Sequence, residues 1–289
     1  MKIELENLGF KYGDVLVFKE INLLLEEPNL TCIIGQNGVG KSTLMHCINK
    51  ILKPVKGLVS LDDVDIQSIG LKDLAKCVGY VPHDASDTFA MTVMDTVLMG
   101  RHPHSGLNIT DKDIHIATDN LKLLGIENLS MRNSDELSAG QHKKVMIARG
   151  LAQEPKILML DEPTAYLDIN HQMHTMKLLR KITREKEISI LVICHDLNIT
   201  ARYADRIIML ANESVYVSGT AKETITVENI KAVYDVDCQI IDIEGRPHVI
   251  LLAGMDECDN CEPYDDESSF LNSKMNPRQI SLDSSKFSN

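Results

Sequence analysis

Hydrophobic and polar residues alternate with two different periodicities along this 289-residue chain. Both ends contain short apolar or alternating runs, which are typical of buried and half-buried strands. The middle has the longer period of amphipathic helices. The expected strands are residues 2–8, 21–25, 30–34, 57–61, 77–81, 157–160 and 188–194. The expected helices are residues 92–99, 111–124 and 139–152.

This order of elements predicts an α/β core, a small antiparallel β subdomain and an inserted helical subdomain. The core is expected to comprise residues 1–84 and 155–225, and the helical subdomain residues 85–154. Residues 254–289 are acidic, rich in Ser and Asn and poor in aliphatic side chains, so we expect a disordered tail. Within it, Cys258 and Cys261 form only half of a zinc site.

Composition narrows the class of protein. Hydrophobic residues make up 44% of the chain and aromatic residues 4%, with no Trp, so the core must be aliphatic and rich in Met. A net charge of -12 argues against binding to nucleic acid or to an anionic membrane surface. The sequence shows no signal peptide and no apolar run of about 20 residues, so we expect a soluble chain. Cys32, Cys47 and Cys194 fall in apolar segments and are read as reduced cytosolic thiols.

One loop carries a phosphate-binding pattern. Residues 35–43, Gly-Gln-Asn-Gly-Val-Gly-Lys-Ser-Thr, connect an apolar strand to a stretch with helical spacing. In that context the backbone N–H groups and the helix start cradle nucleotide phosphates. Lys41 is expected to reach the β- and γ-phosphates of ATP, and Ser42 to bind Mg²⁺. The expected nucleotide-binding residues are Gly35, Asn37, Gly38, Gly40, Lys41, Ser42 and Thr43.

Two acids follow the apolar strand 157–160, at the strand end where parallel sheets bind ligands. Asp161 is expected to hold Mg²⁺ through water, and Glu162 to activate the attacking water as general base. His195 follows the strand 188–194 and is expected to contact the γ-phosphate or to fix the water.

Other signals allow two interpretations each. Tyr12, in an expected turn beside Gly13, is either an adenine-stacking aromatic or an ordinary surface residue. Ser138 and Gly140, at the start of a helix, form either an N-cap alone or a second anion site. His171 and His174 are one helical turn apart, but two ligands do not make a metal site. His102 and His104 flank a proline in an expected turn.

Taken together, these residues resemble those of an ATP-binding-cassette (ABC) nucleotide-binding subunit. The resemblance covers residues 1–252 and implies a P-loop NTPase (RecA-like) core with an inserted signature subdomain. It also implies a head-to-tail dimer, in which ATP lies between Walker A of one copy and the signature helix of the other. The matching segments are Tyr12, Walker A at 35–43, the signature at 137–141 with Ser138, Gly140 and Gln141, Walker B at 157–161 with Glu162, the D-loop at 165–168 with Asp168, and the switch histidine His195.

Residues 92–104 and 162–172 are similar to importer ATPases for metal chelates, a group that handles ferric siderophores, haem, cobalamin and, in some members, molybdate. Residues 226–253 are similar to the C-terminal extension of that group. The resemblance implies peripheral attachment to permease subunits at the cytoplasmic face of the membrane, with a substrate-binding protein as an indirect partner. His102 and His104 would then lie near the membrane partner.

The chain departs from the family pattern at two positions. His83 stands where the family has a glutamine that reaches Mg²⁺. Because imidazole nitrogen is a poor ligand for Mg²⁺, a water-bridged contact is expected in place of direct coordination. Ala139 replaces the first glycine of the signature, which a helical backbone tolerates.

Two alternatives to an importer ATPase come from other classes of function. A soluble cassette ATPase of DNA repair or translation would lack the segment 100–104 and would usually carry coiled-coil or tandem-cassette additions. A non-hydrolysing ATP-binding regulatory subunit is disfavoured by the presence of both Glu162 and His195. An importer for another substrate, such as molybdate, remains an alternative.

Overall fold

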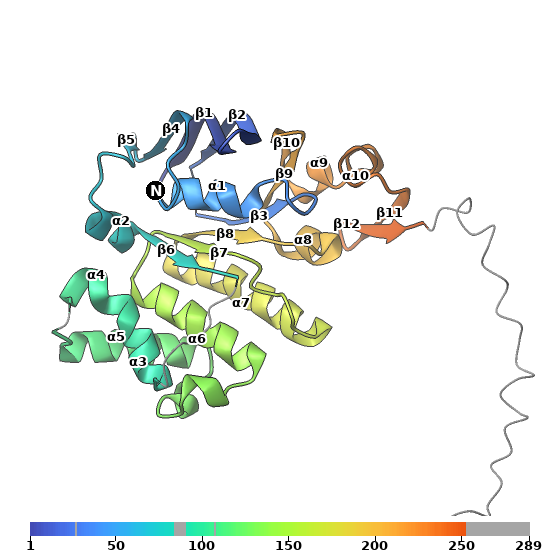
Figure 1. Cartoon of the computed structure of the whole chain (residues 1–289). Coiled ribbons are helices and arrows are strands. Elements are labelled where there is room, and N and C mark those ends of the chain that lie inside the picture. Colours follow the sequence, from blue (N-terminus) through green and yellow to red (C-terminus); the bar gives the residue numbers. More distant parts are fainter. Residues whose placement is uncertain (27, 84–90, 107, 253–289) are drawn as a thin grey trace, which may run out of the picture. The chain divides into compact units, whose positions relative to one another are not determined.

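The computed structural model describes residues 1–26, 28–83, 91–106 and 108–252 (Figure 1). Residues 1–252 form one compact unit. The expected acidic tail, with Cys258 and Cys261, lies outside the described residues.

A six-stranded sheet forms the centre of the unit, in the order β10-β9-β3-β8-β7-β6. Five strands run parallel and β10 pairs antiparallel with β9. Every residue of β3, β7 and β8 is buried, as expected for strands covered on both faces. The strands are β3 (Leu30–Ile34), β6 (Val78–Val81), β7 (Ile157–Leu160), β8 (Ser189–Ile193), β9 (Arg206–Ala211) and β10 (Ser214–Gly219).

Helix α1 (Lys41–Ile48) lies between this sheet and a smaller antiparallel sheet of order β2-β1-β4-β5 (Figure 1). The smaller sheet consists of β1 (Ile3–Tyr12), β2 (Val15–Leu25), β4 (Lys56–Leu61) and β5 (Val64–Asp65). Their inward aliphatic side chains pack with α1 and with one face of the large sheet in a single hydrophobic cluster. This packing fixes the helix start against the sheet edge.

A second cluster fills the opposite face of the large sheet, where α6 and α7 lie (Figure 1). Because side chains alternate along a strand, Cys32 of β3 points into this cluster and Ile33 into the other. The helices of this half are α3 (Val93–Leu98), α4 (His102–Ser105), α5 (Asp111–Leu123), α6 (Ala139–Ala152), α7 (Ile169–Lys186) and α8 (Leu197–Tyr203), with short 3₁₀ turns at 99–101, 127–129 and 134–136.

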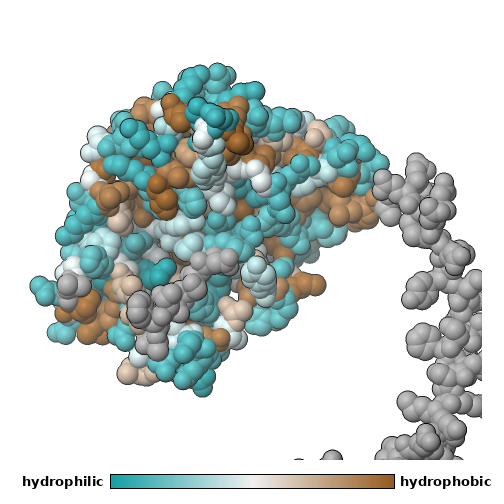
Figure 2. Space-filling view, in the orientation of Figure 1, coloured by the Kyte–Doolittle hydropathy of each residue, from teal (hydrophilic) through white to brown (hydrophobic). Residues whose placement is uncertain are grey.

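The C-terminal segment packs beside α8. It comprises α9 (Ala221–Thr224), α10 (Val227–Tyr234) and the antiparallel hairpin of β11 (Cys238–Ile243) and β12 (Arg246–Leu251). Hydrophobic colour gathers at this end of the molecule in Figure 2, and Ile241, Ile243 and Leu251 of the hairpin are exposed. The remaining helix, α2 (Leu71–Cys77), leads into β6.

The expected α/β fold with an antiparallel sheet and a helical insertion is confirmed, but three local expectations were wrong. Tyr12 lies in a strand and pairs with Val15, because the hairpin turn occupies only the two residues between them. Cys77 ends a helix and does not begin the strand. The segment His102–Ser105 is helical, since a proline in the first helical turn has a preset φ and needs no hydrogen-bond acceptor.

Buried free thiols were expected at Cys32, Cys47 and Cys194, and the structure confirms them. The sulfur atoms of Cys32 and Cys194 are 3.6 Å apart in the core.

Candidate active site

Four neighbouring parallel strands, β3, β8, β7 and β6, end at the same edge of the large sheet. The segments that follow them carry the phosphate-binding loop, His195, the pair Asp161–Glu162, and His83. Residues far apart in the sequence therefore meet at the carboxyl edge, which is where ligands bind in open α/β sheets. We call this set the catalytic edge.

The phosphate-binding loop requires glycine for two separate reasons. Gly35 has φ +148°, and a Cβ atom there would lie 2.4 Å from the carbonyl oxygen of Leu210. Gly40 has φ +100°, and its Cβ would lie 2.6 Å from Val17. Both backbone conformation and close packing thus exclude side chains, and they bring the loop to the start of α1 at Lys41.

Lys41 is buried at the base of this loop. Its Nζ donates hydrogen bonds to the carbonyl oxygens of Gly35 and Gln36, each at 2.9 Å. Burial lowers the pKa of Lys41, while the nearby carboxylates of Glu162 and Asp161 oppose that shift. The ammonium group is held by neutral carbonyls that an anionic phosphate would replace favourably.

Asp161 is also buried, and its two oxygens differ. Oδ2 accepts a hydrogen bond from the Tyr80 hydroxyl at 3.5 Å, and the same hydroxyl lies 2.9 Å from His46 Nε2. Oδ1 is buried without a hydrogen-bond partner among the described residues. Burial raises the pKa of Tyr80, and Asp161 adds to the shift, so the hydroxyl keeps its hydrogen.

An oxygen-rich metal ion fits this arrangement. The unpartnered carboxylate oxygen of Asp161 and the hydroxyl of Ser42 are the hard oxygen ligands that Mg²⁺ prefers. Within the described ranges no group of three His, Cys, Asp or Glu side chains is placed to hold a metal. A metal ion here would therefore need further oxygens from a nucleotide or from water, which is usual for Mg²⁺.

Glu162 lies between two imidazoles. One oxygen accepts a hydrogen bond from His195 Nε2 at 2.5 Å, and the other lies 3.4 Å from His83 Nδ1. Its backbone has φ +49°, a left-handed conformation that a non-glycine residue adopts at some cost in energy. The carbonyl oxygen of His83 accepts a hydrogen bond from Lys143 of α6 at 3.1 Å, which links this residue to the helical subdomain.

The D-loop and the signature lie at helix starts. Asp168 caps α7, and its carboxylate accepts hydrogen bonds from the backbone and the ring of His171, each at 2.8 Å. The backbone bond is the main reason why the pKa of Asp168 is lowered. Ser138 and Gln141 form a reciprocal capping box on α6. Gly140 faces Leu167 and His171, so the signature adjoins the D-loop within one chain.

Tyr12 presents its ring at the end of β1. The residue is 52% exposed, and its ring meets Phe10 edge-on at a centroid distance of 4.9 Å. Packing against Phe10 orients the ring and leaves a large part of it open to solvent, as adenine stacking requires.

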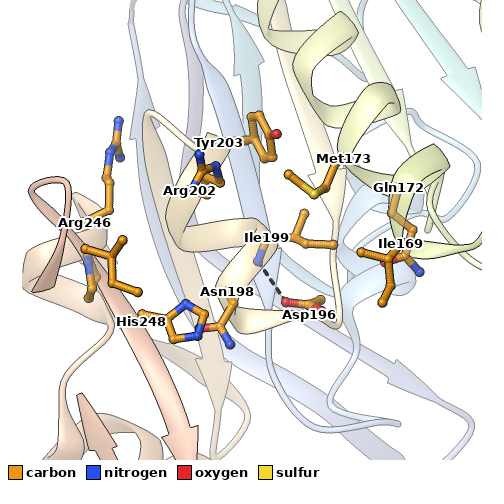
Figure 3. Close-up of a pocket in the computed structure, with 12 residues that line it drawn as sticks. Ile169, Gln172, Met173, Asp196, Asn198, Ile199, Arg202, Tyr203, Arg246 and His248 are labelled. Carbon is orange, nitrogen blue, oxygen red and sulfur yellow. Dashed lines mark hydrogen bonds between the residues drawn. The ribbon is translucent and has the colours of Figure 1, made fainter. Parts of the chain in front are cut away.

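A cavity of about 330 Å³ opens between the start of α7, helix α8 and the β11–β12 hairpin (Figure 3). Several of its polar side chains already have partners in the chain. Asn198 exchanges two hydrogen bonds with the backbone of Val249, and Arg246 donates to the carbonyl oxygens of Ala201 and Ala204. Asp196 caps α8. Among the described residues that line the cavity, none has a buried side-chain N or O atom without a hydrogen-bond partner, whereas Asp161 at the catalytic edge does.

Comparison with known families agrees with this geometry. Residues 18–165 match the family model described as ABC transporter. The chain belongs to the ABC transporter family. The matched region runs from β2 to the first residue of the D-loop, and it includes the phosphate-binding loop, His83 and the pair Asp161–Glu162.

Two relatives are similar to this ABC transporter chain over most of its length. An uncharacterized ABC transporter ATP-binding protein of Methanocaldococcus jannaschii is 44% identical over 250 residues, which cover 86% of this chain and 98% of the relative. The ferric enterobactin transport ATP-binding protein of Escherichia coli is 36% identical over 251 residues, covering 86% and 93%. The expected resemblance to ABC nucleotide-binding subunits is thus confirmed, and the chain is an ATPase of this family.

Among solved structures, a metal-chelate type ABC transporter in an inward-facing conformation has a similar fold. The TM-score is 0.76 at 28% sequence identity, with 87% of this chain and 97% of that chain covered. Most of this chain therefore shares its fold with a chain of that ABC transporter.

Sequence reasoning overlooked three residues at the site: His46, Tyr80 and Tyr234. His46 of α1 contacts Tyr80 of β6, and Tyr80 in turn contacts Asp161, which follows the neighbouring strand β7. Tyr234 ends α10, and the backbone of Gly35 hydrogen-bonds to it. Single His and Tyr residues in amphipathic segments carry no signal of their own, so only their meeting in space identifies them.

Proposed function

We propose that this chain is the ATP-hydrolysing subunit of an importer for a metal chelate of the ferric siderophore, haem or cobalamin type. Two kinds of observation support the proposal: the groups at the catalytic edge and the similar proteins. The catalytic edge holds the groups that ATP hydrolysis needs, and the E. coli relative named above carries ferric enterobactin in its name. The similar solved structure is itself of metal-chelate type.

In this proposal the phosphates of ATP lie on the loop 35–43. The backbone N–H groups of Gly38 and Gly40, the side chains of Lys41 and Thr43, and the positive end of α1 bind the negative charge. Asn37 lines the same loop, and Tyr12 stacks on the adenine. Lys41 exchanges its two carbonyl contacts for phosphate oxygens.

Ser42 and Asp161 would hold Mg²⁺, which neutralises developing charge on the β- and γ-phosphates. Glu162 accepts a proton from the attacking water, and His195 orients Glu162 through its hydrogen bond. His83 contacts the same carboxylate from the other side and takes part through water, without direct metal coordination.

The proposal includes a second copy of the chain. Ser138, Gly140 and Gln141 would meet the γ-phosphate bound by the partner copy, and Asp168 would lie at the contact. Support comes from their exposure, since Ser138 and Asp168 are exposed at helix starts, where the dipole favours anions. The 84% exposed Tyr166 in the D-loop also fits a surface that a partner covers.

Transport also requires a membrane partner. None of the helices in the described part of the chain is both long enough and apolar enough to cross a bilayer. We infer attachment to permease subunits at the cytoplasmic face of the membrane, with a substrate-binding protein that delivers the chelate to the permease.

The observation that carries the proposal is the contact between Glu162 and His195 beside the phosphate-binding loop. The test is transport by proteoliposomes that contain this chain and the permease subunits that copurify with it. Uptake of ferric enterobactin, haem or cobalamin should require Mg²⁺ and ATP on the side of this chain. ATP-driven uptake of molybdate alone would replace the proposed substrate class, and no ATP-dependent uptake of any solute would contradict an importer.

A further inference from the structure

Three side chains from three elements form a hydrogen-bonded series that ends at Asp161. His46 belongs to α1, Tyr80 to β6, and Asp161 follows β7. His46 Nε2 lies 2.9 Å from the Tyr80 hydroxyl, which lies 3.5 Å from Asp161 Oδ2. The His46 and Tyr80 rings also meet edge-on at a centroid distance of 5.5 Å, which supports the first of these contacts.

The hydrogens of this series can be assigned by counting donors. A tyrosine hydroxyl has one hydrogen, and an ionised carboxylate only accepts. The Tyr80 hydrogen must therefore point to Asp161 for that contact to be a hydrogen bond. The hydroxyl oxygen then accepts from His46, which places a hydrogen on Nε2 of the imidazole. With an ionised carboxylate, both contacts of the series are hydrogen bonds only in this order.

The series determines which oxygen of Asp161 is available. Oδ2 is occupied by Tyr80, while Oδ1 is buried and unpartnered among the described residues. A half-turn of the carboxylate only exchanges two equivalent oxygens, but rotation out of its present plane would break the contact with Tyr80. The hydrogen bond thus favours one orientation, with Oδ1 directed away from Tyr80.

The same series reaches the other expected metal ligand. Ser42 and His46 are four residues apart in α1, so they lie on the same face of the helix. A single face of α1 therefore carries the Ser42 hydroxyl and the donor that leads, through Tyr80, to Asp161. The helix that carries Ser42 is thus linked to Asp161 through His46 and Tyr80.

We propose that His46 and Tyr80 are positioning residues of the Mg²⁺ site, which act through Asp161 and set the affinity for the metal ion of Mg·ATP. This inference rests on the proposed binding of Mg·ATP at the catalytic edge. Neither residue touches the metal or the nucleotide. Hydrogen bonds that orient a metal ligand commonly contribute about 10-fold or more to metal affinity.

The test uses Mn²⁺ in place of Mg²⁺, because free Mn²⁺ can be counted by its electron paramagnetic resonance signal. The full chain is saturated with a non-hydrolysable ATP analogue and titrated with Mn²⁺. Tyr80→Phe, which removes only the hydroxyl, should weaken Mn²⁺ binding by about 10-fold. Binding of a fluorescent ATP analogue in EDTA should stay within twofold of the wild type, since Lys41 and the loop are untouched.

Tyr216→Phe is the matched control, because Tyr216 lies on β10 at the opposite edge of the same sheet. Its Mn²⁺ affinity should equal that of the wild type. A second pair of variants tests the donor on α1. His46→Gln keeps an N–H group and should retain Mn²⁺ affinity within about threefold, whereas His46→Leu should lose affinity as Tyr80→Phe does.

Unchanged Mn²⁺ affinity in Tyr80→Phe would overturn the inference. So would an equal loss of metal-free nucleotide binding, because that result indicates a general disturbance of the loop. Failure of the wild type to bind Mn²⁺ with nucleotide would contradict the proposed metal site itself. The wild-type titration therefore separates that failure from a failure of the inference about His46 and Tyr80.

Discussion

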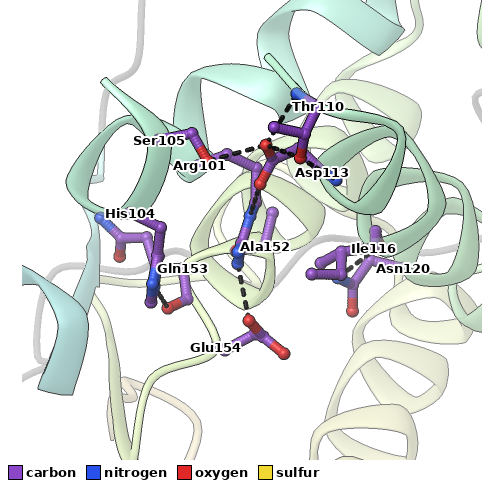
Figure 4. Close-up of polar contacts among 10 residues, drawn as sticks. All are labelled: Arg101, His104, Ser105, Thr110, Asp113, Ile116, Asn120, Ala152, Gln153 and Glu154. Carbon is purple, nitrogen blue, oxygen red and sulfur yellow. Dashed lines mark hydrogen bonds and ion pairs between the residues drawn. The ribbon is translucent and has the colours of Figure 1, made fainter. Parts of the chain in front are cut away.

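Two regions of the molecule bury charged side chains. They differ in whether those side chains are fully hydrogen-bonded within the chain. In the helical subdomain, Arg101 and Asp113 are almost fully buried and bonded to each other at 2.8 Å (Figure 4). Asp113 also accepts hydrogen bonds from Thr110 and Ser105, and Arg101 donates to the carbonyl oxygen of Ala152 at 2.6 Å and to Glu154 at 2.9 Å. At the catalytic edge, Asp161 is buried with one oxygen unpartnered among the described residues, and Glu162 has a left-handed backbone.

This difference in hydrogen bonding indicates that the Arg101–Asp113 cluster is structural and that the catalytic edge is functional. The hydroxyl of Thr110, the guanidinium of Arg101 and the hydroxyl of Ser105 together hold the pKa of Asp113 well below its usual range. That cluster joins α4, α5 and the end of α6. Neither Arg101 nor Asp113 has a buried side-chain N or O atom without a hydrogen-bond partner among the described residues. The catalytic edge leaves an acceptor unused at a cost in stability, and this cost is recovered when a ligand binds.

The largest expected effect is that of Glu162→Gln on ATP hydrolysis. The amide keeps the shape of the side chain but cannot accept the proton, so turnover should fall by about 10²- to 10⁴-fold. ATP binding should persist and an ATP-dependent dimer should accumulate, as size-exclusion chromatography with ATP would show. A monomer in ATP combined with near wild-type hydrolysis would show that the general base was assigned to the wrong residue.

The next effect contrasts the two regions directly through Arg101→Met and Asp161→Asn. Arg101→Met leaves Asp113 charged and buried without its partner, which should cost about 3–5 kcal/mol in the free energy of unfolding. Asp161→Asn should change stability by less than about 1 kcal/mol, because one oxygen of that carboxylate has no bond to lose. Urea unfolding of both variants measures these values, and hydrolysis should fall sharply only in Asp161→Asn.

Stability as a function of pH provides a control on this contrast. Because the folded pKa of Asp113 lies below the unfolded value of about 3.9, its contribution is present above that value. This contribution of Asp113 to the free energy of unfolding is lost as the pH falls through the folded pKa. The stability gap between wild type and Asp113→Asn should therefore be constant near neutrality and narrow only in strong acid. A gap that closes between neutral and mildly acidic pH would contradict the depressed pKa.

A smaller effect is expected from His83→Gln. The glutamine amide oxygen is a better acceptor near Mg²⁺ than imidazole is, so turnover should rise about two- to fivefold with nearly unchanged ATP affinity. Steady-state hydrolysis by the isolated chain measures both values. If His83 serves only the contact with the permease, the isolated variant and wild type will have the same kinetics, and the proposed role at Glu162 would be wrong.

The smallest effect should come from deleting residues 254–289. This segment has few aliphatic side chains to add to either hydrophobic cluster, so melting temperature and basal hydrolysis should stay at the wild-type values. Thermal unfolding of the truncated chain checks this. A large fall in melting temperature, or stoichiometric zinc bound through Cys258 and Cys261, would contradict the expectation of a disordered tail.

The sequence by itself determined the local chemistry. The spacing of Gly35, Gly40 and Lys41 between a strand and a helix predicted the phosphate-binding loop, since backbone conformation there depends on a few neighbouring residues. The apolar runs before Asp161 and His195 likewise predicted strands with polar residues at their ends. The expected fold class follows from the order of these local patterns, and comparison with relatives confirmed it.

Only the tertiary structure decided which side chains touch. The strand order β3-β8-β7-β6 brings His195 and His83 to opposite oxygens of Glu162, although the two histidines are far apart in sequence. Packing of α1 against the sheet joins His46, Tyr80 and Asp161, and the fold leaves one oxygen of Asp161 unpartnered among the described residues. These contacts depend on strand pairing and on buried packing between distant segments. The periodicity of a single segment predicts neither the strand pairing nor the packing between distant segments.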